Sequence, residues 1–203
     1  MTTLATKKTM TSATGSAMWP ALNTPDTKWN PDGGDWKVNL RVEAADAEPM
    51  MEQIKAVLEE YKAAQIIRDP KIARYTMSYP FDDELDDQGN LTGYVIFKFK
   101  QKARILTRDG TILEMSVGLF DAKRKPTKAV VGAGSTIKVA ANLVGYAMPT
   151  SKTFGISLKP TAVQIISLVS GAGASAAMFD DEDGFESTDT VVTSEALDDS
   201  VDF

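Results

Sequence analysis

Cysteine and histidine are both absent from the 203 residues of this sequence. Without cysteine the chain can form neither a disulfide framework nor a thiolate metal site. Without histidine it lacks the commonest zinc ligand, the commonest general base and the base of Ser-His and Cys-His nucleophile pairs. An enzyme made from this sequence would depend on carboxylates, lysine or tyrosine. We therefore expect a protein with no catalytic activity, no cofactor and no metal site.

Long hydrophobic runs are absent as well. No apolar segment is long enough to span a bilayer. Residues 1–16 are rich in threonine, serine and alanine and lack the apolar centre of a signal peptide. With 43% hydrophobic residues the chain can still bury the core of one ordinary domain. These features predict a soluble, intracellular protein that does not contact membranes.

Basic residues are missing from residues 179–203. That segment holds ten of the 28 acidic residues and none of the 22 basic ones. The net charge of −6 therefore hides a body, residues 1–178, in which 22 basic side chains outnumber 18 acidic ones. A basic body joined to an acidic tail suggests binding to a polyanion. The tail has few apolar residues, so we expect it to be disordered.

A clear strand pair is predicted at residues 93–120. In the first strand, apolar and cationic side chains alternate with a period of two, which is typical of a half-buried strand. The cationic positions share one face and are named here the cation ladder: Lys98, Lys100, Lys102 and Arg104. Asp109-Gly110 is a hairpin turn signal, and residues 111–120 return with a matching apolar face. The ladder alone also fits a solvated strand whose lysines discourage edge pairing.

Other elements follow from hydrophobic periodicity and from helix and strand breakers. Residues 23–34, which are rich in proline and glycine, predict a loop that carries Trp29. Apolar residues at helical spacing predict an amphipathic helix over residues 47–65 with Asp46 as its N-cap. Residues 69–93 are expected to form a long connection. The strands expected besides the hairpin cover residues 6–21, 36–42, 136–146 and 155–169.

Two short patterns resemble ligand-binding motifs but fail on their spacing. In the acidic run at residues 82–87, a calcium-binding loop aligned on Gly89 would need a bidentate glutamate where Val95 stands. The Gly-x-Gly at residues 132–134 lacks the third glycine of a dinucleotide-binding loop, and a strand follows it in place of a helix. We interpret the acidic run as a solvated loop and the glycines as the start of a strand.

The order strand, strand, helix, hairpin, strand, strand predicts a mainly β domain. The connections are too short for parallel crossovers, so an antiparallel sheet is expected, and closure into a barrel would remove its edges. The pattern fits an OB-fold-like barrel of five to six antiparallel strands with one α-helix. The expected boundaries are residues 1–169 for this domain, 170–178 for a flexible linker and 179–203 for the disordered acidic tail.

Several segments form a pattern that is more specific in its order and spacing than in any single motif. They are residues 19–22 leading into 34–40, residues 132–135 opening a strand, residues 155–158 running into 162–165, and the closing sequence Asp198-Asp199-Ser200-Val201-Asp202-Phe203. In this pattern the chain resembles the single-stranded DNA-binding proteins of tailed bacteriophages. Those proteins have an OB fold and an acidic C-terminal tail that ends in an aromatic residue.

The resemblance implies non-catalytic, sequence-independent binding and protection of single-stranded DNA during phage DNA replication, recombination and repair. It implies that the tail contacts replication proteins, such as the DNA polymerase and the helicase-primase, and that some members form a homodimer through it. The tail residues implied are Asp198, Asp199, Asp202 and Phe203. The corresponding location is the host cell cytoplasm.

Binding a single strand without sequence preference needs a cationic groove for the backbone and aromatic faces on which bases stack. The cation ladder would supply the cations. Tyr94 and Phe120 share the outward parity of their strands and are our candidates for stacking. Trp29 either stacks on bases from its loop or packs against the body. Further basic residues predicted to contact DNA are Lys123, Arg124, Lys125, Lys128 and Lys138.

Two other functions stay open on the sequence. A structural virion or decoration protein would use the acidic tail only for solubility. A metal-dependent nuclease would use the carboxylates of residues 82–87. Two-metal sites usually gather ligands from several elements, whereas these acids lie in one expected loop, so the nuclease ranks last.

Overall fold

The computed structural model describes residues 8–107 and 109–169. Its strands are β1 (Lys8–Thr11), β2 (Gly15–Asp26), β3 (Asp35–Glu43), β4 (Thr76–Ser78), β5 (Phe81–Leu85), β6 (Leu91–Lys102), β7 (Arg104–Leu106), β8 (Ile112–Glu114), β9 (Gly118–Phe120), β10 (Thr136–Met148) and β11 (Thr153–Ser167). Between β3 and β4 lie the helix α1 (Ala44–Arg68) and the 3₁₀ helix η1 (Pro70–Arg74). Strands dominate these residues, which confirms the prediction of a mainly β domain.

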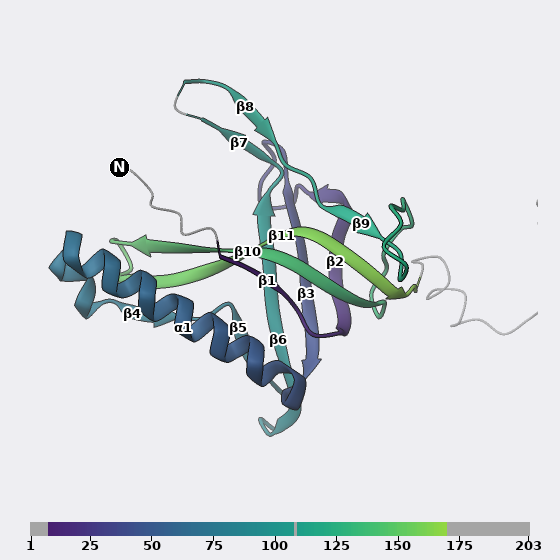
Figure 1. Ribbon diagram of the computed structural model, residues 1–203, viewed down its shortest axis with the longest axis horizontal. Helices are drawn as coiled ribbons and strands as arrows, with labels where there is room; N and C mark the ends of the chain where they lie inside the picture. Colours follow the sequence, from purple (N-terminus) through teal and green to yellow (C-terminus); the bar gives the residue numbers. More distant parts are fainter. Residues whose placement is uncertain (1–7, 108, 170–203) are drawn as a thin grey trace, which may run out of the picture.

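A closed ring of strands forms the body (Figure 1). In the described part of the chain, β2 pairs with β3, β3 with β6, β6 with β11, β11 with β10, and β10 with β2. This ring confirms the OB-fold-like barrel. The expectation that every pair is antiparallel is wrong for β11, which runs parallel to β4 and β9, and within the ring also runs parallel to β6, where Phe99 lies beside Leu158. β6 and β11 are far apart in the sequence, so no short connection prevents a parallel pairing.

The alternating pattern of β6 determines which residues fill the barrel. Val95, Phe97 and Phe99 point inward and are at most 1% exposed. Across the β3–β6 pair, Leu40 lies opposite Phe97 and Val38 lies opposite Phe99, and both are fully buried. Burial of each such side chain contributes about 1.5–3 kcal/mol to folding. The core therefore rests on the period-two pattern that the sequence displays.

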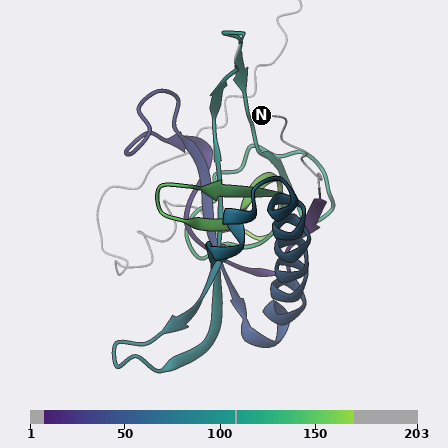
Figure 2. The same ribbon diagram turned by 90° about the vertical axis from the view of Figure 1, so that its left-hand side faces the viewer.

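Helix α1 packs along the side of the barrel (Figure 2). Its inward face buries the apolar residues at helical spacing: Ala47, Met50, Ile54 and Leu58. Farther along, the ring of Tyr61 stacks on Phe154 with centroids 5.0 Å apart. A Cβ at Gly145 of β10 would lie 2.3 Å from the Tyr61 ring, so this close approach requires glycine. The predicted helix is confirmed, with its limits extended at both ends.

The predicted N-cap of the helix is wrong. The helix begins at Ala44 with Glu43 as its N-cap, and Asp46 lies in the first turn. No side chain caps the amide groups at this end. Because β3 runs directly into α1, strand pairing positions the chain at the helix start. In the first turn, the Asp46 carboxylate still interacts favourably with the positive end of the helix dipole.

The connection expected at residues 69–93 contains three elements. It holds η1, β4 and β5, and β5 pairs antiparallel with β6. The expectation of a solvated loop over the acidic run is wrong for residues 82–85, which belong to β5. The acids are tolerated there because Asp82 forms an ion pair with Lys98 and Glu84 forms one with Arg41.

The strand pair predicted at residues 93–120 is correct only near its turn. β7 and β8 form a short ladder around the expected turn and project from the barrel at the end opposite the β5–β6 hairpin (Figure 2). Beyond Glu114 the chain leaves this ladder, and β9 pairs in parallel with β11. The returning strand cannot pair along β6 because β3, β5 and β11 already occupy its edges. Several apolar residues of the β7–β8 hairpin are exposed as a result, among them Leu106 and Ile112.

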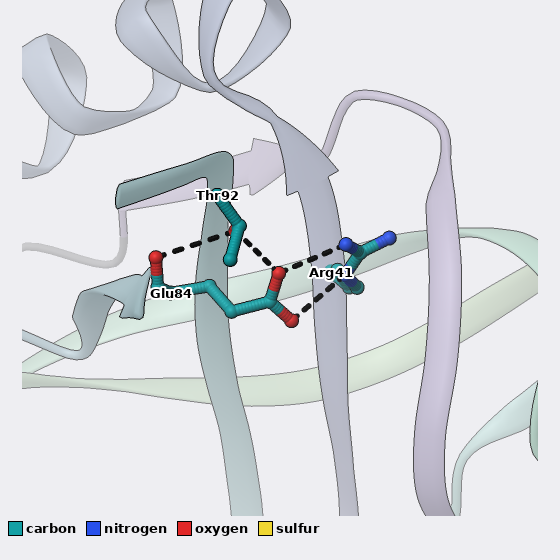
Figure 3. Close-up of polar contacts among 3 residues, drawn as sticks. All are labelled: Arg41, Glu84 and Thr92. Atoms are coloured by element: carbon teal, nitrogen blue, oxygen red, sulfur yellow. Dashed lines mark hydrogen bonds and ion pairs between the residues drawn. The ribbon is translucent and has the colours of Figure 1, made fainter. Parts of the chain in front are cut away.

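Arg41, Glu84 and Thr92 join three neighbouring strands (Figure 3). Arg41 donates two hydrogen bonds of 2.8 Å to the Glu84 carboxylate, and the Thr92 hydroxyl donates a third of 2.5 Å. These donors, Arg41 before Thr92, lower the pKa of Glu84 below its ordinary value. The charged form of Glu84 therefore stabilises the folded protein, and this contribution is lost as the pH falls through the lowered pKa.

We predict that Glu84→Gln lowers the free energy of unfolding at pH 7 by about 1 kcal/mol, because a neutral amide cannot replace the charge-assisted pair. The deficit should shrink as the pH falls below about 4.5, the ordinary glutamate pKa. Urea denaturation at a series of pH values measures this. Asp83→Asn is the matched control, since Asp83 is exposed and has no ion-pair partner among the described residues. A deficit that does not change with pH would contradict the assignment.

Candidate nucleic-acid interface

A groove of about 890 Å³ lies over the outer faces of β6 and β11. Side chains on a strand alternate between the two faces, so the same alternation that buries Phe97 and Phe99 turns Lys98, Lys100 and Lys102 outward into this groove. Lys159 of β11 adds a fourth cation. The aromatic residues that line the groove are Trp29, Tyr79 and Tyr146.

Three members of the cation ladder have acidic partners on neighbouring elements, namely Lys98, Lys100 and Arg104. Lys98 forms an ion pair with Asp82 of β5, and both side chains are more than half exposed. Lys100 Nζ lies 2.8 Å from the carboxylate of Asp35, whose side chain is only 7% exposed. Lys102 has no ion-pair partner among residues 8–107 and 109–169. A ligand could therefore approach Lys102 directly, and it could displace the exposed carboxylate from Lys98.

Arg104 is separated from the other ladder residues. It begins β7, outside the groove, where its guanidinium lies 3.4 Å from Glu114. Its aliphatic chain packs against Gly33 of the loop that carries Trp29, so Arg104 flanks the groove without lining it. The structure therefore brings three of the four predicted ladder residues together on the groove.

Trp29 is exposed, in keeping with a role in stacking. Its side chain is 81% exposed in the loop between β2 and β3, with Lys28 Nζ 5.5 Å from the ring centroid. The alternative that Trp29 packs against the body is therefore wrong. OB folds use this loop for ligand binding, and here it forms one wall of the groove.

Tyr94 lies outside the groove. It is half-buried at the start of β6, and the guanidinium of Arg41 lies 3.4 Å from its ring centroid. One face of the ring is thus occupied by a cation that Glu84 holds in place. The prediction that a base stacks on Tyr94 stays a prediction, and the structure places it apart from the ladder cations of the groove.

Phe120 and the remaining basic residues gather in a second place. Phe120, Arg124 and Lys138 line a smaller pocket of about 280 Å³ beside β10 and β11. Lys123 and Lys125 lie in the adjoining turn, where both backbone amides donate to the Asp121 carboxylate. Lys128 is exposed in the segment that follows. Apart from Tyr94 and Arg104, the predicted DNA-binding residues of the body therefore form two clusters, and the DNA contacts of this second cluster stay a prediction.

Several groove residues were missed by sequence reasoning. Lys159 lies within an expected strand but shares no cationic repeat with its neighbours. Tyr79 and Tyr146 are far apart in the sequence and come together only through the folding of β4, β10 and β11. A signal was also present at Lys37, which lies beside the groove and does not line it: it alternates with buried residues of β3 and lies directly opposite Lys100. Like charges in such a pair destabilise a sheet unless something offsets them, and Asp26 does so at Lys37.

Asp86, in the turn that follows β5, has a structural role. Asp86 accepts hydrogen bonds from the backbone amides of Gln88 and Asn90, which lowers the pKa of its carboxyl. Within the described residues no group of three or more acidic side chains could hold a metal ion. None of the helices described is long and apolar enough to cross a membrane. The linker at residues 170–178 and the tail residues Asp198, Asp199, Asp202 and Phe203 lie outside the described residues.

Comparisons with known proteins agree on one family. The family model described as the single-stranded DNA-binding protein of bacteriophage T7 matches residues 15–168. The crystal structure of gp2.5, a single-stranded DNA-binding protein encoded by bacteriophage T7, superposes with a TM-score of 0.67 at 26% identity, covering 90% of this chain and 100% of that one. No curated protein sequence matches the chain.

A second phage protein shares the fold at lower identity. The C-terminally truncated single-stranded DNA-binding protein of bacteriophage Enc34 superposes with a TM-score of 0.52 at 10% identity, covering 78% of this chain and 85% of that one. The Enc34 protein in complex with single-stranded DNA gives 0.51 at 9% identity, with 78% and 86% covered. The T7 family model, which spans well over half of the sequence, decides the assignment. The chain therefore belongs to the phage single-stranded DNA-binding proteins represented by that of bacteriophage T7.

Proposed function

We propose that this protein binds single-stranded DNA in the groove over β6 and β11, without sequence preference and without catalysis. Phosphates would lie along Lys98, Lys102 and Lys159, and bases would stack on Trp29. In this role it would protect DNA during replication, recombination and repair in the host cell cytoplasm. The observation that carries the proposal is a cationic groove with a highly exposed tryptophan at its wall, on a family fold that in the Enc34 protein has been solved with single-stranded DNA.

The chemistry of the groove suits a single strand. Cations that follow a strand can track a phosphate backbone, and aromatic faces accept any base, because every base has a π-face. The exposed ion pair at Lys98 can exchange its carboxylate partner for a phosphate at little cost, since exposed pairs contribute little to stability. A duplex hides its base faces by stacking. The groove should therefore prefer single strands.

We predict that the double substitution Lys98→Ala and Lys102→Ala flattens the slope of log affinity against log salt by more than one unit. Each phosphate neutralised on a single strand contributes about −0.7 to that slope. Fluorescence anisotropy with a labelled oligonucleotide, titrated at several salt concentrations, measures it. Lys100 is left intact because its removal would leave the buried Asp35 carboxylate without its cation.

The matched control is the double substitution Lys55→Ala and Lys71→Ala, which removes two exposed cations of α1 and η1 outside the groove. It changes the net charge equally, so it corrects for the general attraction between protein and DNA. Equal flattening in the two double variants would show that the DNA does not follow the groove.

We predict that Trp29→Ala weakens single-strand binding by about 1–3 kcal/mol, the range found when a stacking aromatic is removed. The salt slope should stay the same because no charge is lost. Tyr94→Ala should weaken binding less, since Arg41 already covers one face of that ring. Binding isotherms and thermal melts of the two variants measure this. A larger loss of affinity for Tyr94→Ala, with both variants folded, would move the stacking position away from the groove.

The acidic tail completes the proposed function. A flexible chain with the length of residues 170–203 has a reach of roughly 30 Å, about the width of a small domain. A tethered polyanion at that reach competes with DNA for the same cations. When DNA displaces it, the tail would become available to the DNA polymerase and the helicase-primase, with Phe203 as an apolar anchor beside Asp198, Asp199 and Asp202. A tail that links two copies would also provide a route to a homodimer.

We predict that truncation before Phe179 raises affinity for single-stranded DNA, and most strongly at low salt, where screening is weakest. Phe203→Ala should leave DNA affinity unchanged but abolish association with the polymerase. Anisotropy titrations and pull-down with purified polymerase measure the two effects. Unchanged low-salt affinity after truncation would end the competition idea, and polymerase association that survives Phe203→Ala would end the anchor idea.

A further inference from the structure

Trp19 interrupts β2 at a bulge. In the β2–β3 pair, Met18 lies opposite Asn39 and the next paired residue, Ala21, lies opposite Lys37. Two residues of β2, Trp19 and Pro20, therefore occupy the space opposite one residue of β3. Trp19 is turned out of the barrel and is 66% exposed. A bulge of this kind re-aims a side chain that would otherwise alternate into the core.

The backbone at Trp19 is unfavourable for a large side chain. Its φ is +47°, in the left-handed region that bulky residues rarely adopt. The residue before a proline is further restricted, and Pro20 follows directly. Glycine would fit this conformation without strain, and the tryptophan ring gains little burial in exchange. The strain therefore has no compensation within the barrel, and such strain is concentrated at functional sites.

The surroundings of Trp19 connect it to the groove. On β3 the neighbouring outward residues are Lys37 and Asn39, and these lie opposite Lys100 and Lys98 of β6. Adjacent strands are about 4.8 Å apart, so the path from β6 across β3 to β2 crosses two such steps. The strands β2, β3 and β6 are neighbours in one barrel wall (Figure 1). A polar and cationic strip on them thus leads from the edge of the groove to an exposed aromatic ring.

We propose that Trp19 is a second base-stacking position, at which single-stranded DNA that leaves the groove and crosses β3 is held on the bulge of β2. This inference rests on the proposed function, because it extends the same DNA path. The ligand it takes is an unpaired nucleobase, with its neighbouring phosphate near Lys37. The Lys37 ammonium is paired with Asp26 and both side chains are partly exposed, so a phosphate can compete for it.

The test compares Trp19→Gly with Trp29→Ala on oligothymidylates of about 4 and about 16 nucleotides, the range of site sizes for OB folds. Trp19→Gly should weaken binding of the longer strand roughly 5- to 150-fold and leave the shorter one unchanged. Its melting temperature should equal or exceed that of the original protein, because glycine relieves the left-handed strain. Trp19→Phe, which keeps an aromatic face, should retain most of the affinity for the longer strand.

Several results would overturn the inference. A lower melting temperature for Trp19→Gly, with normal affinity per folded molecule, would make Trp19 a structural residue. Equal weakening for both lengths would place Trp19 inside the primary site. A change in sedimentation with unchanged DNA affinity would assign the ring to a contact between copies of the chain.

Failure of the proposed function can be distinguished from failure of this inference. If the original protein does not bind the oligonucleotides, or if Trp29→Ala has no effect on either length, the groove itself is not the binding site, and the extension fails with it. If Trp29→Ala weakens binding to both lengths while Trp19→Gly changes neither, the groove stands and only the second stacking position is refuted.

Discussion

Strand β6 is the part of the molecule on which both the core and the proposed binding surface depend. Its inward residues Phe97 and Phe99 are buried against β3, while its outward residues Lys98 and Lys100 line the groove. A slip of one residue would place lysines in the core and phenylalanines in solvent. The register that stabilises the barrel is therefore the same register that builds the cationic face. Because β3, β5 and β11 all pair with β6, three strands fix that register.

The cations of this face are held by carboxylates of different exposure. Lys98 shares an exposed partner, Asp82, whereas Lys100 has a buried one, Asp35. The buried partner ties Lys100 to the fold, and the exposed partner leaves Lys98 available to another anion. The acids reduce repulsion between neighbouring cations and so allow the sheet to carry them. In the proposed function, a DNA phosphate replaces a weak surface ion pair without disturbing the barrel.

Local patterns could be predicted from the sequence, whereas long-range pairings could not. The alternation of β6 gave its buried and exposed faces, and apolar spacing gave α1, because both signals lie within a few residues. The destination of residues 111–120 was missed, since it depends on the edges of β6 being occupied by strands distant in the sequence. The acidic run became a strand because Arg41 and Lys98 neutralise it. Tyr79 and Tyr146 join Trp29 only through the closed barrel, and the bulge at Trp19 has no local signature apart from the following proline.

In the proposed function, single-stranded DNA lies along the outer face of β6, in the groove walled by Trp29. Photochemical cross-linking of the full chain to iodouracil-substituted single-stranded DNA, followed by mass spectrometry of the cross-linked peptides, tests this directly. We predict cross-links at Trp29 and at neighbouring aromatic residues of the groove, which disappear when unlabelled single strand is added in excess. Cross-links confined to the pocket of Phe120 and Lys138, with none in the groove, would contradict it.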